Sequence, residues 1–291
     1  MVNLIQRFRP KGIAVTDLSA QLWCEKQLEF TLDKGRKETK EMKIGKDRHR
    51  KLHEEVAVLV KVEPKTFVDV IALKLHNSKV GLNRLITSGM TREIPLFGRI
   101  NSLFVTGITD ELYLKGSYFL ILDTKTRQRD SMPTEAQKRT TRFQLMLYNR
   151  LIQDLISKKF TAEDLLNFYE FKPSDSISNG LKEQIKDMNE EIEPNIKQLC
   201  DETFRLFQRL PYPEKLMQIR YEYQQNKKLI GKDEFIFDDS TFNKDCNFVE
   251  EFWLGKRNAI PVGINNSWKC NFCEFNDACE EKPIKKQNIY K

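Results

Sequence analysis

Two carboxylates and a lysine near the middle of the sequence have residue types and spacing that suit a divalent cation. Asp123 and Lys125 follow the apolar run 118–122, and two steps along a strand return a side chain to the same face. Asp110 lies in the preceding apolar run, and a turn at 115–117 would bring it beside them. Carboxylates suit Mg²⁺ or Mn²⁺, which activates water and neutralises phosphate charge, while Lys125 would hold the nucleophile or stabilise developing negative charge. A surface ion pair is the alternative interpretation.

Four of the six cysteines form a second candidate site. Cys270, Cys273 and Cys279 have the spacing C-x2-C-x5-C, and three thiolates so spaced can bind one metal centre. Cys24, near the other end of the chain, is the natural fourth ligand. Thiolates serve both zinc and iron–sulfur clusters, so these residues leave the metal open. A three-cysteine zinc site with another ligand and a set of reduced buried thiols are the alternatives.

Two pairs of polar side chains have helical spacing. His49 and His53 are four residues apart, as are Gln144 and Tyr148, so on a helix each pair shares one face. Gln and Tyr can donate to phosphate or to base edges. An exposed glutamine beside a core tyrosine is the ordinary interpretation of that spacing.

The elements that must position these residues are strands in the middle of the chain and helices on either side. Gly-bounded apolar runs predict paired strands within 94–126. Thr16 predicts the start of a helix that carries Cys24, and Thr134 with Gln137 predicts a capping box opening a helix to about residue 157. Further helices are expected over 39–62, from Thr161 and over 181–210, whereas 211–265 has no clear pattern.

Composition bounds the class of protein. The chain has 291 residues, of which 40% are hydrophobic and 31% charged, enough to bury a core. No stretch approaches the roughly 20 apolar residues of a membrane-spanning helix, and the start lacks the apolar centre of a secretory signal. We expect an intracellular protein in the nucleus, the mitochondrion or the cytoplasm, without a membrane partner.

The positive charge excess has a location. Lys and Arg number 49 against 42 Asp and Glu, a net charge of +7, which by itself permits nucleic acid, acidic protein or anionic lipid as a partner. Much of it lies between Lys125 and Arg142, beside the proposed cation site. A phosphate track and a solvated helix face are equally consistent with this run. On the first interpretation Arg127 and Arg142 would bind DNA.

Taken together, these motifs resemble the exonuclease V family, an iron–sulfur branch of the PD-(D/E)xK nuclease superfamily related to RecB-type nuclease domains. They occur in the family's order and cover the chain nearly end to end. The residues that carry the resemblance are VTDLSAQLWC at 15–24, GITDEL at 107–112, DTKTR at 123–127, QLMLY at 144–148 and WKCNFCEF at 268–275, with Cys279.

The resemblance implies roles for particular residues. Asp110 and Asp123 would bind the catalytic divalent cation, with Lys125 positioning water. The family pattern G-x3-H-x3-E matches in its first half, which makes His49 a further cation ligand. The position expected to hold glutamate is His53, followed by Glu54, and the sequence does not decide whether either joins the site.

The resemblance also implies the remaining ligands. Gln144 and Tyr148 match the family's Q-x3-Y motif, which is associated with DNA contact near the active centre. The four cysteines Cys24, Cys270, Cys273 and Cys279 match the ligands of a [4Fe–4S] cluster, which moves the choice from zinc to iron–sulfur.

The expected fold class is α/β: a PD-(D/E)xK nuclease core with a small mixed sheet flanked by helices, and an iron–sulfur cluster joining the N-terminal helix to the C-terminal tail. We expect one nuclease domain over 1–291, with its core at about 40–175 and the cluster segments at 16–30 and 266–282.

The expected activity is Mg²⁺-dependent hydrolysis of single-stranded DNA from its ends, from either end, in genome maintenance. A structure-specific endonuclease and a catalytically inert iron–sulfur DNA-binding protein are the alternatives. We expect the protein to act as a monomer, with single-stranded DNA and a single-strand DNA-binding protein as partners.

Overall fold

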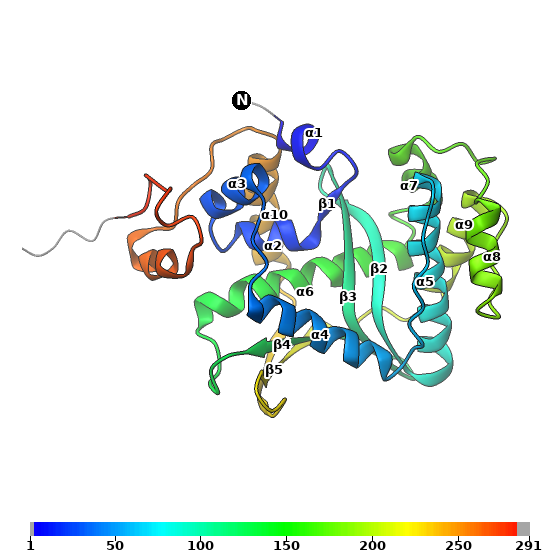
Figure 1. Cartoon of the computed structure of the whole chain (residues 1–291), viewed down its shortest axis with the longest axis horizontal. Helices are drawn as coiled ribbons and strands as arrows, with labels where there is room; N and C mark the ends of the chain where they lie inside the picture. Colours follow the sequence, from blue (N-terminus) through cyan, green and yellow to red (C-terminus); the bar gives the residue numbers. More distant parts are fainter. Residues whose placement is uncertain (1–2, 284–291) are drawn as a thin grey trace, which may run out of the picture.

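One mixed β-sheet lies at the centre of the molecule. The computed structural model describes residues 3–283, so the ends of the predicted domain lie outside the described residues. The strands follow the order β1-β3-β4-β5-β6, and β2 pairs with β3 as well (Figure 1). They are β1 (Ile13–Ala14), β2 (Met90–Ile100), β3 (Leu103–Lys115), β4 (Tyr118–Arg127), β5 (Leu216–Tyr223) and β6 (Leu229–Ile236).

Two tight turns connect the three long strands. The β2–β3 turn contains Asn101 with a φ of 50°, and the β3–β4 turn contains Gly116 with a φ of 62°. Positive φ at such positions matches the twist of the flanking strands, and Asn and Gly tolerate it best. The predicted turn at 115–117 is confirmed, and the antiparallel β2–β3 ladder pairs every residue of β2 except Glu93 with a residue of β3.

β3 and β4 separate in the middle of the sheet. β3 pairs with β4 from Glu111 to Lys115 and with β1 at Val105 and Thr106. From Leu122 onward β4 pairs with β5, in parallel. The strands therefore diverge next to Asp110 and Asp123, which leaves a space between them for side chains.

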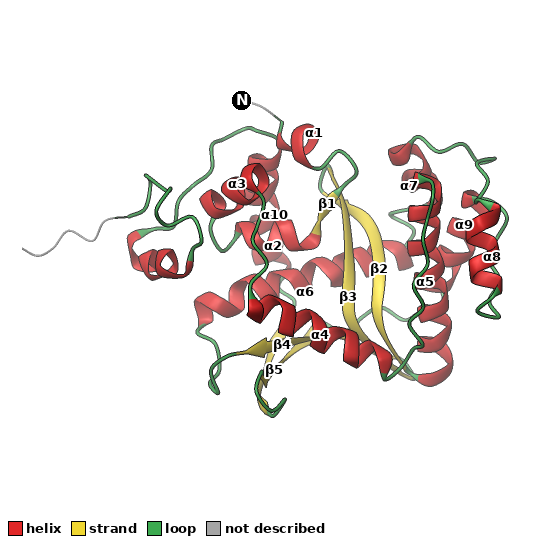
Figure 2. Cartoon of the chain, viewed as in Figure 1, coloured by secondary structure: helices red, strands yellow, loops and turns green. Residues whose placement is uncertain are grey.

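Helices pack on the sheet, and their apolar side chains form the hydrophobic core together with those of the strands (Figure 2). α5 (Phe67–Ser88) runs beside β2, and α6 (Glu135–Ile156) and α4 (Lys40–Glu54) cross the strands (Figure 1). Apolar side chains of α5 and α6, such as Leu75 and Leu151, are fully buried against the strands. The other helices are α1 (Leu4–Phe8), α2 (Val15–Gln21), α3 (Glu25–Lys34), α7 (Ala162–Tyr169), α8 (Asn179–Lys186), α9 (Ile196–Phe207) and α10 (Asp239–Trp253).

Helix starts were predicted with mixed accuracy. Thr134 and Gln137 form the expected capping box of α6, and Thr161 caps α7. The prediction that Thr16 caps a helix carrying Cys24 is wrong. The N-cap of α2 is Ala14, two residues earlier, whose backbone N–H donates to the Asp17 carboxylate. The helix ends before Cys24, which is instead the residue preceding α3.

The predicted core boundary and some helices also need correction. The sheet extends beyond 40–175, because β1 precedes that range and β5, β6 and α10 occupy the unassigned segment 211–265. α4 ends at Glu54, before the apolar residues 56–60, and the stretch 181–210 divides into α8 and α9. None of the described helices combines the length and apolar character that crossing a membrane requires.

Candidate functional site

The two aspartates and the lysine converge where β3 and β4 separate. Lys125 Nζ lies 2.9 Å from Asp123 Oδ1 and 4.0 Å from Asp110 Oδ2. Asp123 is 1% exposed, and Asp123 Oδ2 and Asp110 Oδ2 are buried without a hydrogen-bond partner. Buried carboxylate oxygens normally have partners. Two unpaired oxygens beside each other fit a cation with oxygen ligands.

Asp110, Asp123 and Lys125 shift one another's pKa values. Burial, followed by the charge of Asp123, raises the pKa of Asp110 well above its usual range. Burial alone would raise the pKa of Asp123 too, but the Lys125 ammonium outweighs it and the pKa is lowered. The pKa of Lys125 is raised, because the two carboxylates outweigh its burial. Lys125 is therefore a cation at neutral pH, and Asp110 is the carboxyl most in need of a further positive charge.

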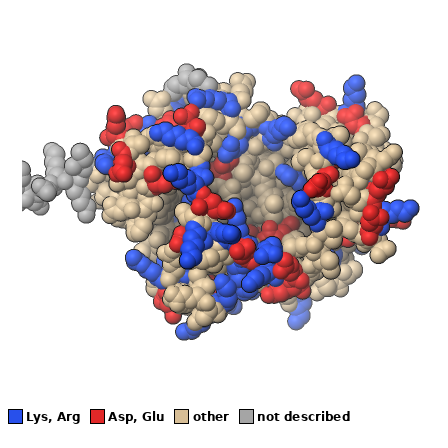
Figure 3. Space-filling view, in the orientation of Figure 1, with Lys and Arg blue, Asp and Glu red and all other residues tan. Residues whose placement is uncertain are grey.

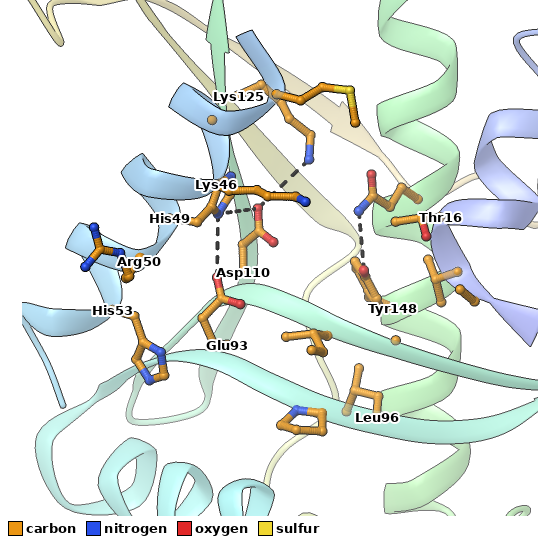
Figure 4. A pocket seen from close by; sticks show the side chains of 18 of the residues that line it. Thr16, Lys46, His49, Arg50, His53, Glu93, Leu96, Asp110, Lys125 and Tyr148 are labelled. Carbon is orange, nitrogen blue, oxygen red and sulfur yellow. Dashed lines mark hydrogen bonds and ion pairs between the residues drawn. The ribbon is translucent and has the colours of Figure 1, made fainter. Parts of the chain in front are cut away.

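Helix α4 and strand β2 add a histidine and a glutamate on the other side of Asp110 (Figure 4). His49 Nδ1 lies 3.5 Å from Asp110 Oδ2 and 3.6 Å from Glu93 Oε1. One ligand atom from each of these three side chains lies within 4.8 Å of the others. Sequence reasoning predicted His49 and missed Glu93.

Glu93 reaches the site through an unusual backbone conformation. Its φ is 56°, in the left-handed region, within an otherwise regular strand. The β2–β3 register pairs Arg92 with Glu111 and Ile94 with Thr109, so Glu93 lies opposite Asp110. The signal that could have found Glu93 is that register, counted from the turn at Asn101, rather than any motif.

A large pocket opens in front of these side chains. Its volume is about 1070 Å³, and Figure 3 shows a hollow on this face with Lys and Arg side chains around it. Glu93, Asp110 and Lys125 line it together with apolar residues such as Leu96 and Phe97. Its basic lining residues also include Arg36, Lys46, Arg50 and Lys74.

Gln144 and Tyr148 line the same pocket from α6. Gln144 Nε2 donates to Tyr148 Oη over 3.3 Å. A side chain on Gly107 would clash with the Tyr148 ring, since a Cβ there would lie 2.7 Å from it, so this glycine lets α6 approach β3. Burial and the charge of Asp110 raise the pKa of Tyr148, so its hydroxyl remains a proton donor at neutral pH.

The structure places the two predicted DNA-binding arginines outside this pocket. Arg142 donates two hydrogen bonds to Asp233, from Nε at 2.8 Å and from Nη2 at 2.6 Å, and pairs with Glu135. Arg127 lies at the end of β4, where its Nε is buried without a partner and burial lowers its pKa. Helical spacing along α6 turns Arg142 toward β6 rather than toward the carboxylates.

His53 and Glu54, the candidates for the second half of the predicted histidine motif, lie in different surroundings. His53 lines the pocket, and burial lowers its pKa, which favours a neutral imidazole. Glu54 pairs instead with Arg50, over 3.3 Å. Neither belongs to the group formed by His49, Glu93 and Asp110.

An ion pair holds α4 over the sheet. Arg48, next to His49, donates to Glu222 of β5 from Nε at 2.7 Å and from Nη2 at 2.9 Å. The side chains are 17% and 14% exposed. Gln224 adds a bond to the carbonyl of Glu41, over 3.3 Å. Strand β5, which sequence reasoning left unassigned, therefore fixes the helix that carries His49.

The four predicted cysteine ligands line one cavity at an end of the molecule, close to α3. Cys24 precedes α3, and the other three lie in and after the 3₁₀-helix η1 (Ile264–Phe272). All are free thiols. Burial raises the pKa values of Cys270 and Cys273, so a cation is needed to hold thiolates there at neutral pH.

Aromatic and polar contacts attach this cysteine region to the body of the protein. Trp23 and Trp268 pack edge to face with ring centroids 5.5 Å apart, and Lys269 Nζ donates to the carbonyl of Trp23 over 3.1 Å. Glu274, next to Cys273, accepts from the backbone N–H of Lys37, over 3.2 Å.

Comparisons with known proteins assign the chain to a family. A family model described as exonuclease V, a 5′ deoxyribonuclease, matches residues 3–118, 114–205 and 196–281. Exonuclease V of Danio rerio is 28% identical over 285 residues, which cover 95% of this chain and 72% of the relative. The crystal structure of SSO0001 superposes with a TM-score of 0.43 at 13% identity, over 94% of this chain and 87% of the other. The chain belongs to the exonuclease V family, a family of nucleases that hydrolyse DNA.

Proposed function

We propose that this protein is a Mg²⁺-dependent exonuclease that hydrolyses single-stranded DNA from either end, in genome maintenance, on a PD-(D/E)xK core. The observation that carries the proposal is the pair of buried, unpartnered oxygens on Asp110 and Asp123 beside Lys125. Three charged groups so placed at the edge of a basic pocket fit a phosphodiester better than a neutral substrate.

Each residue has a defined task in this reaction. Asp110 and Asp123 would hold the divalent cation, which supplies a polarised water and neutralises charge on the phosphate. Lys125, held by Asp123 at 2.9 Å, would stabilise the developing negative charge with its ammonium group and position the attacking water. The hydroxyl of Tyr148, whose raised pKa keeps it protonated, would donate a hydrogen bond to the substrate phosphate.

The residues that line the pocket also favour a single-stranded substrate. Arg36, Lys46 and Arg50 line it beside Leu96 and Phe97, so charge for the backbone and apolar surface for the bases are adjacent. Single-strand binding sites combine these two features, and their tolerance of sequence follows because every base has an apolar face.

We propose a [4Fe–4S] cluster for the cysteine region. Four free thiols line one cavity, but only His49, Glu93 and Asp110 meet within 4.8 Å among the described residues. Zn–S bonds of about 2.3 Å in a tetrahedron bring all four sulfurs to within about 4 Å of one another, whereas no three of the described thiols meet within 4.8 Å. The wider spacing favours a multi-iron centre over a single zinc ion.

Cleavage of labelled DNA tests the nuclease proposal. Purified protein with Mg²⁺ should release label from linear single strands marked at the 5′ end or at the 3′ end, and Asp123→Ala should slow release about a thousandfold, the loss of roughly 4 kcal/mol of charge stabilisation. Circular single strands should resist. Cutting of circles would identify an endonuclease, and equal rates for Asp123→Ala and the parent would refute the assignment of the site.

Metal analysis tests the cluster proposal. Protein purified without oxygen should absorb visible light and contain about four iron and four sulfide per chain. Colourless protein that contains zinc would contradict the proposal.

A further inference from the structure

We propose that Lys269 is the internal counter-ion of the cysteine region, and that its ammonium group stabilises the negative charge of a cluster bound there by thiolates. The inference rests on the proposed [4Fe–4S] cluster, to which it adds the residue that balances the cluster's charge. Lys269 lies in η1 and lines the same cavity as the four cysteines.

Lys269 is buried, which is unusual for a lysine. It is only 7% exposed. Lysine is almost never fully buried unless it is paired, because an ammonium group loses its hydration when it leaves water. The burial of this side chain therefore indicates that a negative charge belongs near it.

The described residues offer Lys269 little compensation. Its Nζ donates to the backbone carbonyl of Trp23 over 3.1 Å and lies 4.4 Å from the centroid of the Trp23 ring. The ionisable groups that act on its charge are the Cys24 thiol and the Arg139 guanidinium, of which a thiolate would attract it and the guanidinium repels it. No carboxylate within 3–283 pairs with it. A neutral oxygen and an aromatic face leave most of the charge unbalanced.

Two other lysines line the cavity, and their charges are offset in ways that Lys269 lacks. Lys26 pairs with Glu29 over 3.0 Å and with Glu281 over 2.6 Å. Lys282 is exposed, so water solvates its ammonium group. Lys269 has neither a carboxylate among the described residues nor access to bulk water.

The thiols of the cavity can supply the missing negative charge. Four thiolates outnumber the positive charges of a [4Fe–4S] core, so the bound centre is an anion. Lys269 is also the residue before Cys270, and the carbonyl that it contacts belongs to the residue before Cys24. Its ammonium group therefore joins the two segments of the chain that carry the thiols, beside the cavity where the anion would form.

This role predicts an effect on the reduction potential of the cluster. Reduction adds one electron to the cluster and makes the centre more negative, while no bond breaks and no proton moves. A fixed positive charge beside a buried cluster stabilises the reduced form more than the oxidised form, so it raises the potential. Removing the charge should make the cluster harder to reduce.

A redox titration of the full-length protein, purified without oxygen, tests the inference. Dithionite supplies the electron, and electron paramagnetic resonance follows the reduced cluster. Lys269→Gln, which keeps a neutral N–H donor, should lower the equilibrium constant for reduction at least about tenfold, a shift of about 59 mV to lower potential for a one-electron couple. Lys282→Gln removes the same charge from an exposed position of the same cavity and should change that constant less than about threefold, because water and salt screen it.

The outcomes separate this inference from the proposed function. Equal potentials for Lys269→Gln and the parent would overturn it, as would an equally large shift in Lys282→Gln. If Lys269→Gln does not retain iron, Lys269→Met gives the same comparison with a neutral side chain of similar length. Loss of iron from both, with iron retained in Lys282→Gln, would support the inference, because the centre then needs the ammonium group in order to bind.

The parent protein distinguishes the two remaining cases. Colourless protein without iron would refute the cluster proposal and this inference with it. A coloured parent with normal redox behaviour but no DNA cleavage would count against the nuclease proposal alone, since the titration uses no DNA.

Discussion

The carboxylate site and the cysteine region hold their ligands in different ways. Glu93, Asp110 and Asp123 lie on strands of one sheet, flanked by residues whose backbones pair in the β2–β3, β3–β4 and β4–β5 ladders. The cysteines lie in a short 3₁₀-helix, in turns and before α3, beside one end of the protein (Figure 1). The sheet determines the positions of the carboxylates without any ion, whereas the cysteine region depends on side-chain contacts and on whatever the thiols bind.

The difference follows from the cost of bringing charges together. Carboxylates that repel one another can be held by a sheet, because the ladder and its buried apolar side chains outweigh the repulsion. The region around Cys270 contacts the body through Trp268, Lys269 and Phe275, with Phe275 stacked on Phe30 at a centroid distance of 5.4 Å. Loss of a bound cation should therefore stop chemistry at the first site and unfold the surroundings of the second.

The largest expected effect is a loss of folding stability in the cysteine region that a change in the carboxylate site should not cause. Cys273→Ser should lower the free energy of unfolding by about 3 kcal/mol, a quarter of the roughly 10–16 kcal/mol that a four-ligand structural metal site contributes. Amide hydrogen exchange should rise over 264–279, and absorbance in the visible range should fall. Mass spectrometry of exchanged peptides and a thermal melt measure both effects.

Asp123→Ala is the matched comparison for this experiment. It should leave exchange over 264–279 and the visible absorbance as in the parent, although cleavage is lost. Equal melting temperatures for Cys273→Ser and the parent would mean that the cysteine region holds itself together without its ligand set, and the contrast between the two regions would disappear.

A smaller effect is expected where α4 meets the sheet. Glu222→Gln weakens the paired hydrogen bonds from Arg48, and bonds to charged groups contribute about 1.5–3 kcal/mol. Burial of this ion pair is incomplete, so we expect a loss of about 1.5 kcal/mol in the attachment of α4 to the sheet. The rate of DNA cleavage should fall by at most about tenfold, the value reached when the whole loss falls on the transition state. Amide exchange over 40–54 should rise, because fewer contacts then hold the helix in place.

Charge reversal provides the control. The double variant Arg48→Glu with Glu222→Arg should recover much of the rate, since the opposite charges still meet. If Glu222→Gln changes neither exchange nor rate, then α4 is fixed by other contacts, and the positioning of His49 does not depend on β5.

The smallest effect concerns an ion pair away from both sites. Burial would raise the pKa of Asp233, but Arg142 and Lys138 outweigh it and lower the pKa. A lowered folded-state pKa adds stability that is complete above the unfolded pKa of about 3.9 and is lost as pH falls through the folded value. Asp233→Asn should therefore destabilise the protein by about 1 kcal/mol, equally at about pH 5.5 and about pH 8.

Urea unfolding at the two pH values measures this difference. A destabilisation that grows between them would contradict a lowered pKa for Asp233. Arg142→Ala should show a loss of stability similar to that of Asp233→Asn, with the DNA dissociation constant within about twofold of the parent, because Arg142 lies outside the pocket.

Sequence reasoning reached the parts of the site that local periodicity determines. Asp123 and Lys125 meet because a strand returns to the same face every two residues, and the turn at 115–117 brings Asp110 near. The capping box at Thr134 likewise depends only on residues three apart. These features need no knowledge of the rest of the chain.

The parts that were missed depend on pairing between distant segments. Glu93 enters the site through the register of β2 on β3, and a left-handed residue inside a strand has no sequence signal when the residue is glutamate. Strand β5 was unassigned because its polar residues 218, 220 and 222 form bonds and ion pairs with other elements rather than a regular pattern. The sequence identified the basic residues of α6 but not the direction of their side chains, since Arg142 faces β6 rather than the carboxylates.

The divergence of β3 and β4 has a consequence for dividing the protein into smaller units. Asp110 belongs to the β2–β3 pairing, whereas Asp123 lies opposite Ile219 of β5. A fragment ending at residue 175 would contain each acidic ligand proposed here and yet lack the strand against which Asp123 is aligned. A fragment meant to keep the proposed site must therefore extend at least through β5, which ends at Tyr223.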